Sequence, residues 1–181
     1  MTRLTMQELQ VQFEAAFNAH NDELFRYASM RVNDRERALE LTQECFVKAF
    51  EYAKRGNTID DLRPFLYRTL RNLIIDEYRK KKATSLEQMV EGDEGGDVEA
   101  LMPVDESNTL EAAIDRFDGK RALAALNELP DLYREAVSLR YIEGLTPQEI
   151  AAIVGESQTT VSVRVHRGLK KLRDLLDHDT A

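Results

Sequence analysis

The sequence predicts an all-α protein, because its composition favours helices and its apolar residues recur at helical spacing. Ala, Leu, Glu and Arg are abundant, whereas glycine occurs 8 times in 181 residues and tryptophan is absent. Between residues 34 and 54, apolar side chains return every three or four positions, which is the spacing of one face of a helix. With 43% hydrophobic and 32% charged residues, we expect one large or two small globular domains.

The same composition argues against several classes of protein. No long apolar run occurs and the first residues, MTRLTMQELQ, lack an apolar core, so we expect no membrane insertion, no export and a cytoplasmic location. Cys45 stands alone, and His20, His166 and His178 lie far apart in the chain. We therefore predict no disulfide, no metal site, no cofactor and no catalytic residue.

Charge divides the chain into three segments. Residues 1–84 carry 15 Lys and Arg against 13 Asp and Glu, residues 85–118 carry 1 against 11, and residues 119–181 carry 9 against 9. The middle segment has three glycines and only scattered apolar residues, so it cannot bury enough surface to offset its ordering entropy. We predict two small helical domains, 1–84 and 119–181, joined by an acidic flexible linker at 85–118.

The helix predicted over residues 34–54 has two distinct faces. Its apolar arc runs from Ala38 to Ala53 and contains Cys45, where a lone cysteine usually acts as a small hydrophobe. Glu40, Glu44 and Glu51 point the other way together with Val47, because successive residues turn by about 100°. Such an acidic stripe is commonly just a solvated face.

A second helix is predicted to begin with Pro64 at its first position. Its core side is expected to carry four aliphatic residues and two tyrosines: Leu66, Leu70, Leu73, Ile74, Tyr67 and Tyr78. Another face gathers cations, and four of them in a row close the helix, where they complement the negative end of its macrodipole. The functional alternative is a phosphate-binding face for unpaired nucleic acid, since basic grooves with stacking side chains hold single strands.

The C-terminal segment carries the strongest pattern. A helix is predicted from Pro130 to Gly144, and its apolar residues are Leu132, Ala136, Val137, Leu139 and Tyr141. Thr146, Pro147 and Glu149 then supply a capping hydroxyl, a first-turn proline and a carboxylate three residues after the cap. About eight residues later, Gly155 permits a tight left-handed turn before a further helix near Ser157.

These features together predict a helix-turn-helix. Ala151 precedes Gly155 by four residues and Val161 follows it by six, so a small residue lets the helices approach and an apolar one docks between them. Residues 157–173 contain five cations and no anion, which suits a recognition helix lying in the major groove. An ordinary helical hairpin with a basic face is the plainer alternative.

The residues resemble a known family. LTQECFVKAF (Leu41–Phe50), FLYRTLRNLIIDEYRKK (Phe65–Lys81) and the segment Leu126–Arg173 are similar, in this order, to three segments of bacterial sigma factors of the extracytoplasmic-function (ECF) group. The chain departs from the family's usual residues at Glu40, Phe65, Leu70 and Ser162-Val163. The resemblance implies an alternative sigma factor that binds core RNA polymerase, recognises minus-ten and minus-thirty-five promoter elements and initiates transcription of a specific regulon.

The resemblance also assigns residues to three surfaces. Those implied to bind the clamp of the largest polymerase subunit are Glu40, Gln43, Glu44, Val47 and Glu51. Those implied to contact the minus-ten element are Arg68, Arg71, Asn72, Arg79, Lys80 and Lys81, preceded by a loop, Gly56–Arg63, that receives an unstacked base. Those implied to contact the minus-thirty-five element are Thr159, Thr160, Ser162, Val163, Arg164, His166, Arg167 and Lys170.

Further partners follow from the same resemblance. They are the flap of the second-largest polymerase subunit, promoter DNA and an anti-sigma protein that occludes the factor. The linker, with a net charge of -10 from 1 cation and 11 anions, suits a positively charged RNA channel, although a plain flexible spacer remains possible.

Three other functions stay open on the residues alone. A stand-alone regulator would use the same helix-turn-helix to bind operator DNA without polymerase. An enzyme is disfavoured, because the chain has no HExxH, GxGxxG or P-loop motif. A purely structural helical adaptor would leave the capped turn and the anion-free helix unexplained.

Overall fold

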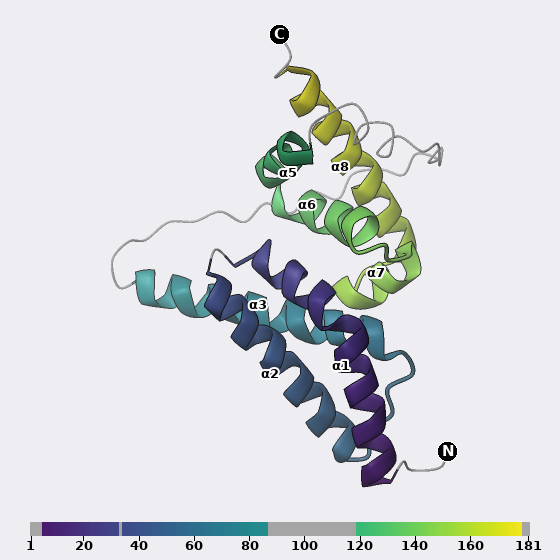
Figure 1. Cartoon of the computed structure of the whole chain (residues 1–181). Helices are drawn as coiled ribbons and strands as arrows, with labels where there is room; N and C mark the ends of the chain where they lie inside the picture. Colours follow the sequence, from purple (N-terminus) through teal and green to yellow (C-terminus); the bar gives the residue numbers. More distant parts are fainter. Residues whose placement is uncertain (1–4, 33, 87–118, 179–181) are drawn as a thin grey trace. The chain divides into compact units, whose positions relative to one another are not determined.

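The computed structural model describes residues 5–32, 34–86 and 119–178, and every regular element in these ranges is helical, so the all-α prediction is confirmed (Figure 1). The chain divides into two compact units, Met1–Gly95 and Gly96–Ala181. The N-terminal unit contains α1 (Met6–Ser29), α2 (Arg35–Lys54) and α3 (Leu62–Leu86). The C-terminal unit contains α5 (Gly119–Glu128), α6 (Asp131–Val137), a π-helical turn η1 (Ser138–Ile142), α7 (Pro147–Val154) and α8 (Gln158–His178). Most of the predicted linker lies outside the described residues.

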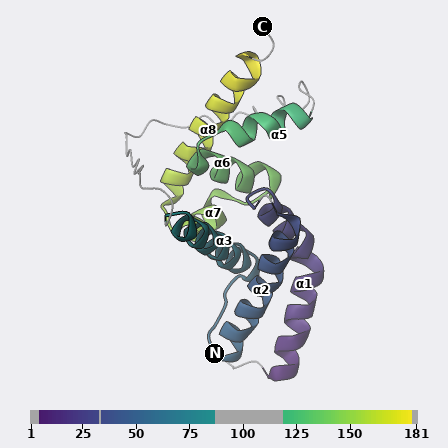
Figure 2. The same cartoon turned by 90° about the vertical axis from the view of Figure 1, so that its left-hand side faces the viewer.

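Helices α1 and α2 lie side by side and antiparallel in the N-terminal unit (Figures 1 and 2). The Phe13 and Phe50 rings meet edge to face with centroids 5.3 Å apart, and the Phe17 and Phe46 rings lie 5.0 Å apart. These pairs contribute beyond the area they bury, because the edge of one ring is attracted to the face of the other. Helix α1, which the sequence patterns did not single out, begins with a capping box between Thr5 and Glu8.

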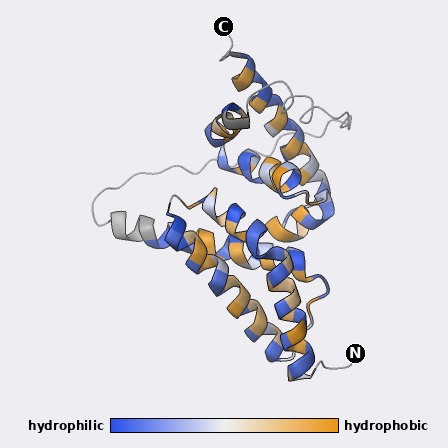
Figure 3. Ribbon diagram, viewed as in Figure 1, coloured by the Kyte–Doolittle hydropathy of each residue, from blue (hydrophilic) through white to orange (hydrophobic). Residues whose placement is uncertain are grey.

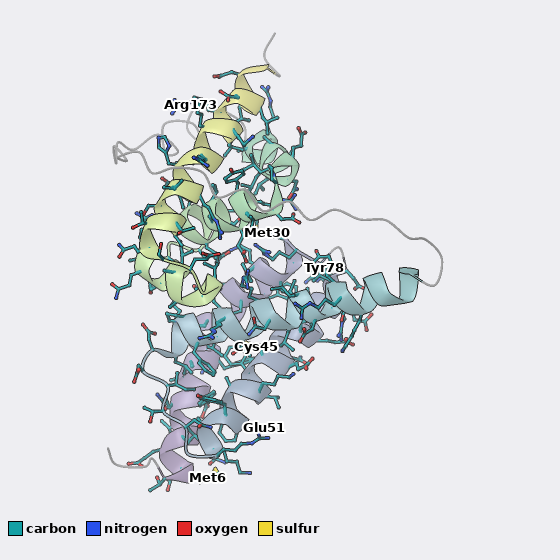
Figure 4. All side chains as sticks on the ribbon, turned by 180° about the vertical axis from the view of Figure 1, so that it is seen from behind. Met6, Met30, Cys45, Glu51, Tyr78 and Arg173 are labelled. Atoms are coloured by element: carbon teal, nitrogen blue, oxygen red, sulfur yellow. The ribbon has the colours of Figure 1, made fainter. Side chains whose placement is uncertain are left out.

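Helix α3 crosses both neighbours and closes the core of the unit. Cys45 lies in the interior of this bundle and is fully buried, as its place on the apolar arc predicts (Figure 4). Its thiol donates to the carbonyl oxygen of Leu66 at 3.2 Å. Burial raises the pKa of the Cys45 thiol to about 12, so the cysteine is a core residue with no nucleophilic character.

Two arginines join the helices of this unit through carboxylates. Arg63 of α3 makes two hydrogen bonds to Glu23 of α1, at 3.0 and 2.9 Å, and His20 shares the same carboxylate at 2.7 Å. Arg37 of α2 pairs with Glu77 of α3 at 2.6 Å. Both contacts connect residues 40 positions apart, so they fix the angles between helices rather than the helices themselves.

Two expectations for α3 are corrected by the structure. The helix begins at Leu62 instead of Pro64, because Asp61 accepts the backbone N–H of Arg63 at 3.1 Å and so starts the first turn earlier. Proline is still tolerated at the third position, where its missing N–H has no helical partner to lose. Tyr78 is 52% exposed, because α3 extends beyond α1 there, and only its hydroxyl reaches back to donate to the carbonyl of Arg31.

In α6 and η1, whether a residue is buried depends mainly on how far along the helix it lies, and less on which way its side chain points around the helix axis. All residues from Glu135 to Leu139 are buried, since α8 and α7 cover this stretch. Leu132 and Tyr141, at the two ends of the apolar pattern, are 49% and 36% exposed, because they lie outside that cover. Figure 3 shows the mixed hydrophobic and hydrophilic faces of the other helices, where direction around the axis does decide burial.

The helix-turn-helix forms as predicted. Thr146 and Glu149 make a reciprocal capping box at the start of α7, and Gly155 closes that helix with a left-handed φ of 76°. Val161 is 1% exposed, and α8 packs against α7. In α8, Gly168 lies so close to α6 that an added Cβ would stand 2.6 Å from a methyl carbon of Val137. Glycine is therefore required there by close approach, although its φ is ordinary.

Candidate functional site

The first candidate surface lies on α2, and we call Glu40, Gln43, Glu44, Val47 and Glu51 the α2 surface. The five residues span about 100° of the helix, as their spacing predicts. Val47 is 57% exposed and lies between the carboxylates of Glu40, Glu44 and Glu51 on the same face. The three carboxylates pair only with cations of their own helix: Glu40 with Arg37 at 2.7 Å, Glu44 with Lys48 at 3.2 Å, and Glu51 with Arg55 at 4.0 Å.

The ion pairs of the α2 surface are weak enough to be exchanged for contacts with a partner. Exposed pairs within one helix contribute at most about 0.5 kcal/mol, so exchanging them for intermolecular pairs costs little. An apolar centre with a charged rim is also the usual anatomy of a protein interface. The arrangement fits a partner that presents cations around an apolar contact.

The second candidate surface lies on α3 and consists of Arg68, Arg71, Asn72, Arg79, Lys80 and Lys81. Arg68, Asn72 and Arg79 are exposed and lie on one face, because their spacings of four and seven residues return to nearly the same direction. Arg71 is half-buried. Asp76 stands 3.8 Å from Arg79 and moderates the charge there. The α3 surface therefore combines exposed guanidinium groups with one amide, which suits phosphates and base edges.

The loop between α2 and α3 borders a cavity in the same unit. The cavity has a volume of about 250 Å³, with Met6, Leu9 and Phe13 of α1 on one side and Ile59 and Leu62 on the other. Both ends of the loop are held in place. Gly56 has a φ of 90°, and Asn57 donates its side-chain amide to the carbonyl of Tyr52 at 2.9 Å. At the far end, Asp61 caps α3 and Arg63 is clamped by Glu23.

The third candidate surface lies on the first half of α8 and consists of Thr159, Thr160, Ser162, Val163, Arg164, His166, Arg167 and Lys170. Thr159, His166 and Lys170 are exposed, and the other five are half-buried. Ser157 caps the helix by accepting the backbone N–H of Thr160 at 3.0 Å. The surface is uncharged from Thr159 to Val163 and carries its three cations, Arg164, Arg167 and Lys170, after that point.

Sequence patterns did not reveal the pairs that position these surfaces. They include Glu23 with Arg63, Glu77 with Arg37, and Glu156 with Arg164 at 2.9 Å. One local feature could have pointed to the first: Arg63 is a cation in the first turn of a helix, where the macrodipole disfavours it. Among the described residues no group of His, Cys, Asp and Glu side chains could hold a metal ion, and no helix is long and apolar enough to span a membrane.

The fold and these surfaces define a class of protein: a two-unit helical protein whose second unit carries a helix-turn-helix with a basic second helix. Comparison with known families narrows the class. The Sigma-70 region 2 family matches residues 16–84, and the Sigma-70 region 4 family matches residues 120–172. The first contains the α2 and α3 surfaces, and the second contains the helix-turn-helix.

Similar proteins include two mycobacterial sigma factors. The ECF RNA polymerase sigma factor SigE of Mycolicibacterium smegmatis is 32% identical over 157 residues, covering 87% of this chain and 58% of SigE. The ECF RNA polymerase sigma factor SigL of Mycobacterium tuberculosis is 31% identical over 160 residues, covering 88% of this chain and 85% of SigL. A solved structure of the sigma factor RpoE with the anti-sigma factor NepR, from Bartonella quintana, has a TM-score of 0.68 at 23% identity, covering 92% of this chain and 97% of RpoE.

The chain belongs to the ECF sigma factors of bacterial RNA polymerase, and so acts in the initiation and regulation of transcription. The members of this family are DNA-binding initiation factors and are not known as catalysts. The region 2 match contains the segments Leu41–Phe50 and Phe65–Lys81, and the region 4 match covers Leu126–Arg173 up to residue 172, so the predicted resemblance to this family is confirmed.

Proposed function

We propose that the two units divide the work of promoter recognition. The N-terminal unit binds the clamp of the largest polymerase subunit through the α2 surface, and opens and reads the minus-ten element through the α3 surface. The C-terminal unit reads the minus-thirty-five element through the α8 surface and contacts the flap of the second-largest subunit. The domain limits of this division are 1–84 and 119–181, with 85–118 as the connection.

The α2 surface supports the polymerase contact. Its exposed Val47 offers an apolar anchor, and the surrounding carboxylates steer a basic partner toward it. Exposure alone does not decide this, since Val11 of α1 is 62% exposed. The support comes from the combination of Val47 with three carboxylates on a segment that matches sigma region 2.

The α3 surface and the adjoining loop support opening of the minus-ten element. Removing a base from the stack costs a few kcal/mol, which stacking and phosphate contacts must offset. Arg68 and Arg79 supply phosphate contacts, and Asn72 offers both a donor and an acceptor to an unpaired base. The fixed loop Asn57–Asp61 with its cavity offers a preformed place for the extruded base.

The α8 surface supports reading of duplex DNA. Hydroxyls and cations at the start of a recognition helix reach base edges and phosphates in the major groove. The single observation that carries the proposal is the helix-turn-helix itself, in which the capping box, the left-handed Gly155 and the buried Val161 all occur together. It follows, in the chain, a unit that matches sigma region 2.

Regulation and location follow from the same assignment. An anti-sigma protein is a fitting regulator, since the related RpoE was solved in complex with one. A polymerase subunit works where the polymerase is, so we place the protein in the cytoplasm.

Run-off transcription tests this function. Core polymerase, with and without the purified protein, is given genomic fragments, and start sites are mapped. We expect new transcripts whose start sites share two upstream elements. Unchanged transcription, together with selective duplex binding by the protein alone, would instead identify a stand-alone regulator.

A further inference from the structure

An acidic residue lies at the tip of the basic recognition helix. Glu156 occupies the turn between Gly155, which is left-handed with a φ of 76°, and Ser157, which caps α8. The following stretch, 157–173, contains five cations and no anion. A carboxylate at this tip would repel DNA phosphates, so its presence in the part of the fold that approaches the groove calls for an explanation.

Glu156 is engaged by one of the residues assigned to DNA. The Nη2 atom of Arg164 donates to Oε1 of Glu156 at 2.9 Å, across eight residues. Long side chains on helices point back toward the N-terminus, which lets Arg164 reach the turn that precedes its own helix. The contact holds the guanidinium group along the leading end of α8.

Stability does not account for this pair. The two side chains are 22% and 40% exposed, and pairs this exposed contribute little to folding. The pair has two other effects: it fixes the plane of one guanidinium group, and it neutralises one positive charge. Both effects bear on DNA, because arginine reads guanine through two hydrogen bonds in one plane but attracts any phosphate by charge alone.

We propose that Glu156 is a specificity-determining positioning residue, which holds Arg164 in the orientation that reads a base edge and withholds it from nearby phosphates. The inference rests on the proposed role of the α8 surface in duplex recognition. Without the carboxylate, Arg164 swings to the backbone, so the protein gains affinity for every sequence and loses discrimination among them.

The test uses holoenzyme reconstituted from core polymerase and the full chain. Equilibrium affinity is measured over a salt series for two fragments with the same minus-ten element, one with the mapped minus-thirty-five element and one with that element scrambled. For Glu156→Ala we expect the ratio of the two affinities to fall about tenfold, as when one two-bond base contact is lost. The salt dependence on the scrambled fragment should steepen by about one phosphate contact.

Two variants separate positioning from charge. Asp174→Ala removes the same charge from an exposed site further along α8 and should leave the affinity ratio unchanged. Arg164→Ala should lower the ratio as much as Glu156→Ala does, and the double variant should lower it no further, because both act through one contact.

Three outcomes decide the matter. A fallen ratio that depends on Arg164 supports the proposal. The proposal is wrong if Glu156→Ala changes the affinity for both fragments equally, so that the affinity ratio stays at the wild-type value. The proposed function is unaffected by that result, provided that the wild type distinguishes the two fragments. Failure of the wild-type holoenzyme to distinguish the fragments at all overturns the assigned role of the α8 surface and the inference with it.

Discussion

The two units reach stable helix arrangements by different means. In the N-terminal unit, long helices are joined by aromatic pairs and by ion pairs between residues 40 positions apart, such as Glu23 with Arg63. In the C-terminal unit, the short helices α5, α6 and α7 pack against the 21-residue α8, and special backbone positions and close approach, at Gly155 and Gly168, permit this packing. Charged groups of the first unit therefore serve both packing and binding, whereas in the second unit α8 alone carries Arg164, Arg167, Lys170, Lys171 and Arg173.

The two units also differ in the charge of their candidate binding surfaces. The α2 surface is acidic around an exposed valine, and the α8 surface is basic with short hydroxyl side chains among its cations. The first suits a protein partner and the second suits DNA. If this contrast is correct, single substitutions should separate binding of polymerase, opening of DNA and stability of each unit.

The largest effect is expected at the α2 surface. Glu44→Lys reverses a charge at an exposed interface position, so binding to core polymerase should be lost while the helical content stays unchanged. Pull-down with core polymerase and circular dichroism measure the two properties. Asp22→Lys, an exposed site on α1 outside the surface, is the matched control and should still assemble. If Glu44→Lys still assembles with core polymerase, the proposed role of the acidic α2 surface in polymerase binding is wrong.

The C-terminal unit should be most sensitive at Gly168. Gly168→Ala places a methyl group 2.6 Å from Val137 and 3.3 Å from Tyr133, so overpacking should destabilise the unit by about 1–3 kcal/mol despite the better helix propensity of alanine. Hydrogen exchange of α6 and α8 under native conditions measures the loss locally. Arg173→Ala, at an exposed site on the same helix, should change exchange little. Unaltered protection in Gly168→Ala would contradict the claim that the close packing of α6 on Gly168 excludes a larger side chain.

At the α3 surface, the expected effect concerns one step of initiation. Asn72→Ala should weaken the open complex about tenfold, or about 1.4 kcal/mol, and affect the closed complex less, because an unpaired base exists only after opening. Permanganate footprinting reports the open complex, and binding at low temperature reports the closed complex. Equal losses in the two measurements would mean that Asn72 contacts duplex DNA or acts on folding.

The smallest effect is expected from the long-range ion pair. Burial raises the pKa of Glu23, but the hydrogen bonds and charge of Arg63, with help from His20, outweigh it and hold the pKa below its usual range. Because its pKa is lower in the folded state, the ionised Glu23 carboxylate stabilises the fold at pH values above the ordinary carboxyl range. This contribution to the free energy of unfolding is lost as the pH falls through the lowered pKa. Glu23→Gln should therefore cost about 1 kcal/mol at pH 7 and progressively less below about pH 4.5.

Denaturant unfolding of wild type and Glu23→Gln across this pH range measures the difference. Glu14→Gln, exposed on the same helix, serves as the control for a lost charge. A difference that grows as the pH falls would contradict the role assigned to the pair.

Local patterns predicted much of this molecule. The two faces of α2, the capping box at Thr146 and the left-handed Gly155 follow from spacing and backbone preference, which act over a few residues. Leu132 and Tyr141 belong to the apolar pattern of their helix and are nevertheless exposed, because helical spacing does not show where along its length a helix is covered. Gly168 and the Glu156–Arg164 pair escaped prediction, since both depend on which side chains meet after the helices have turned.

One measurement tests the whole account most directly: equilibrium binding of duplex promoter DNA at physiological salt by the purified protein, with and without core polymerase. Each unit has nearly balanced charge outside the acidic segment, so the protein alone should bind weakly and without preference. Addition of core polymerase should produce tight binding that requires both promoter elements. Tight, sequence-selective binding by the protein alone would contradict the account.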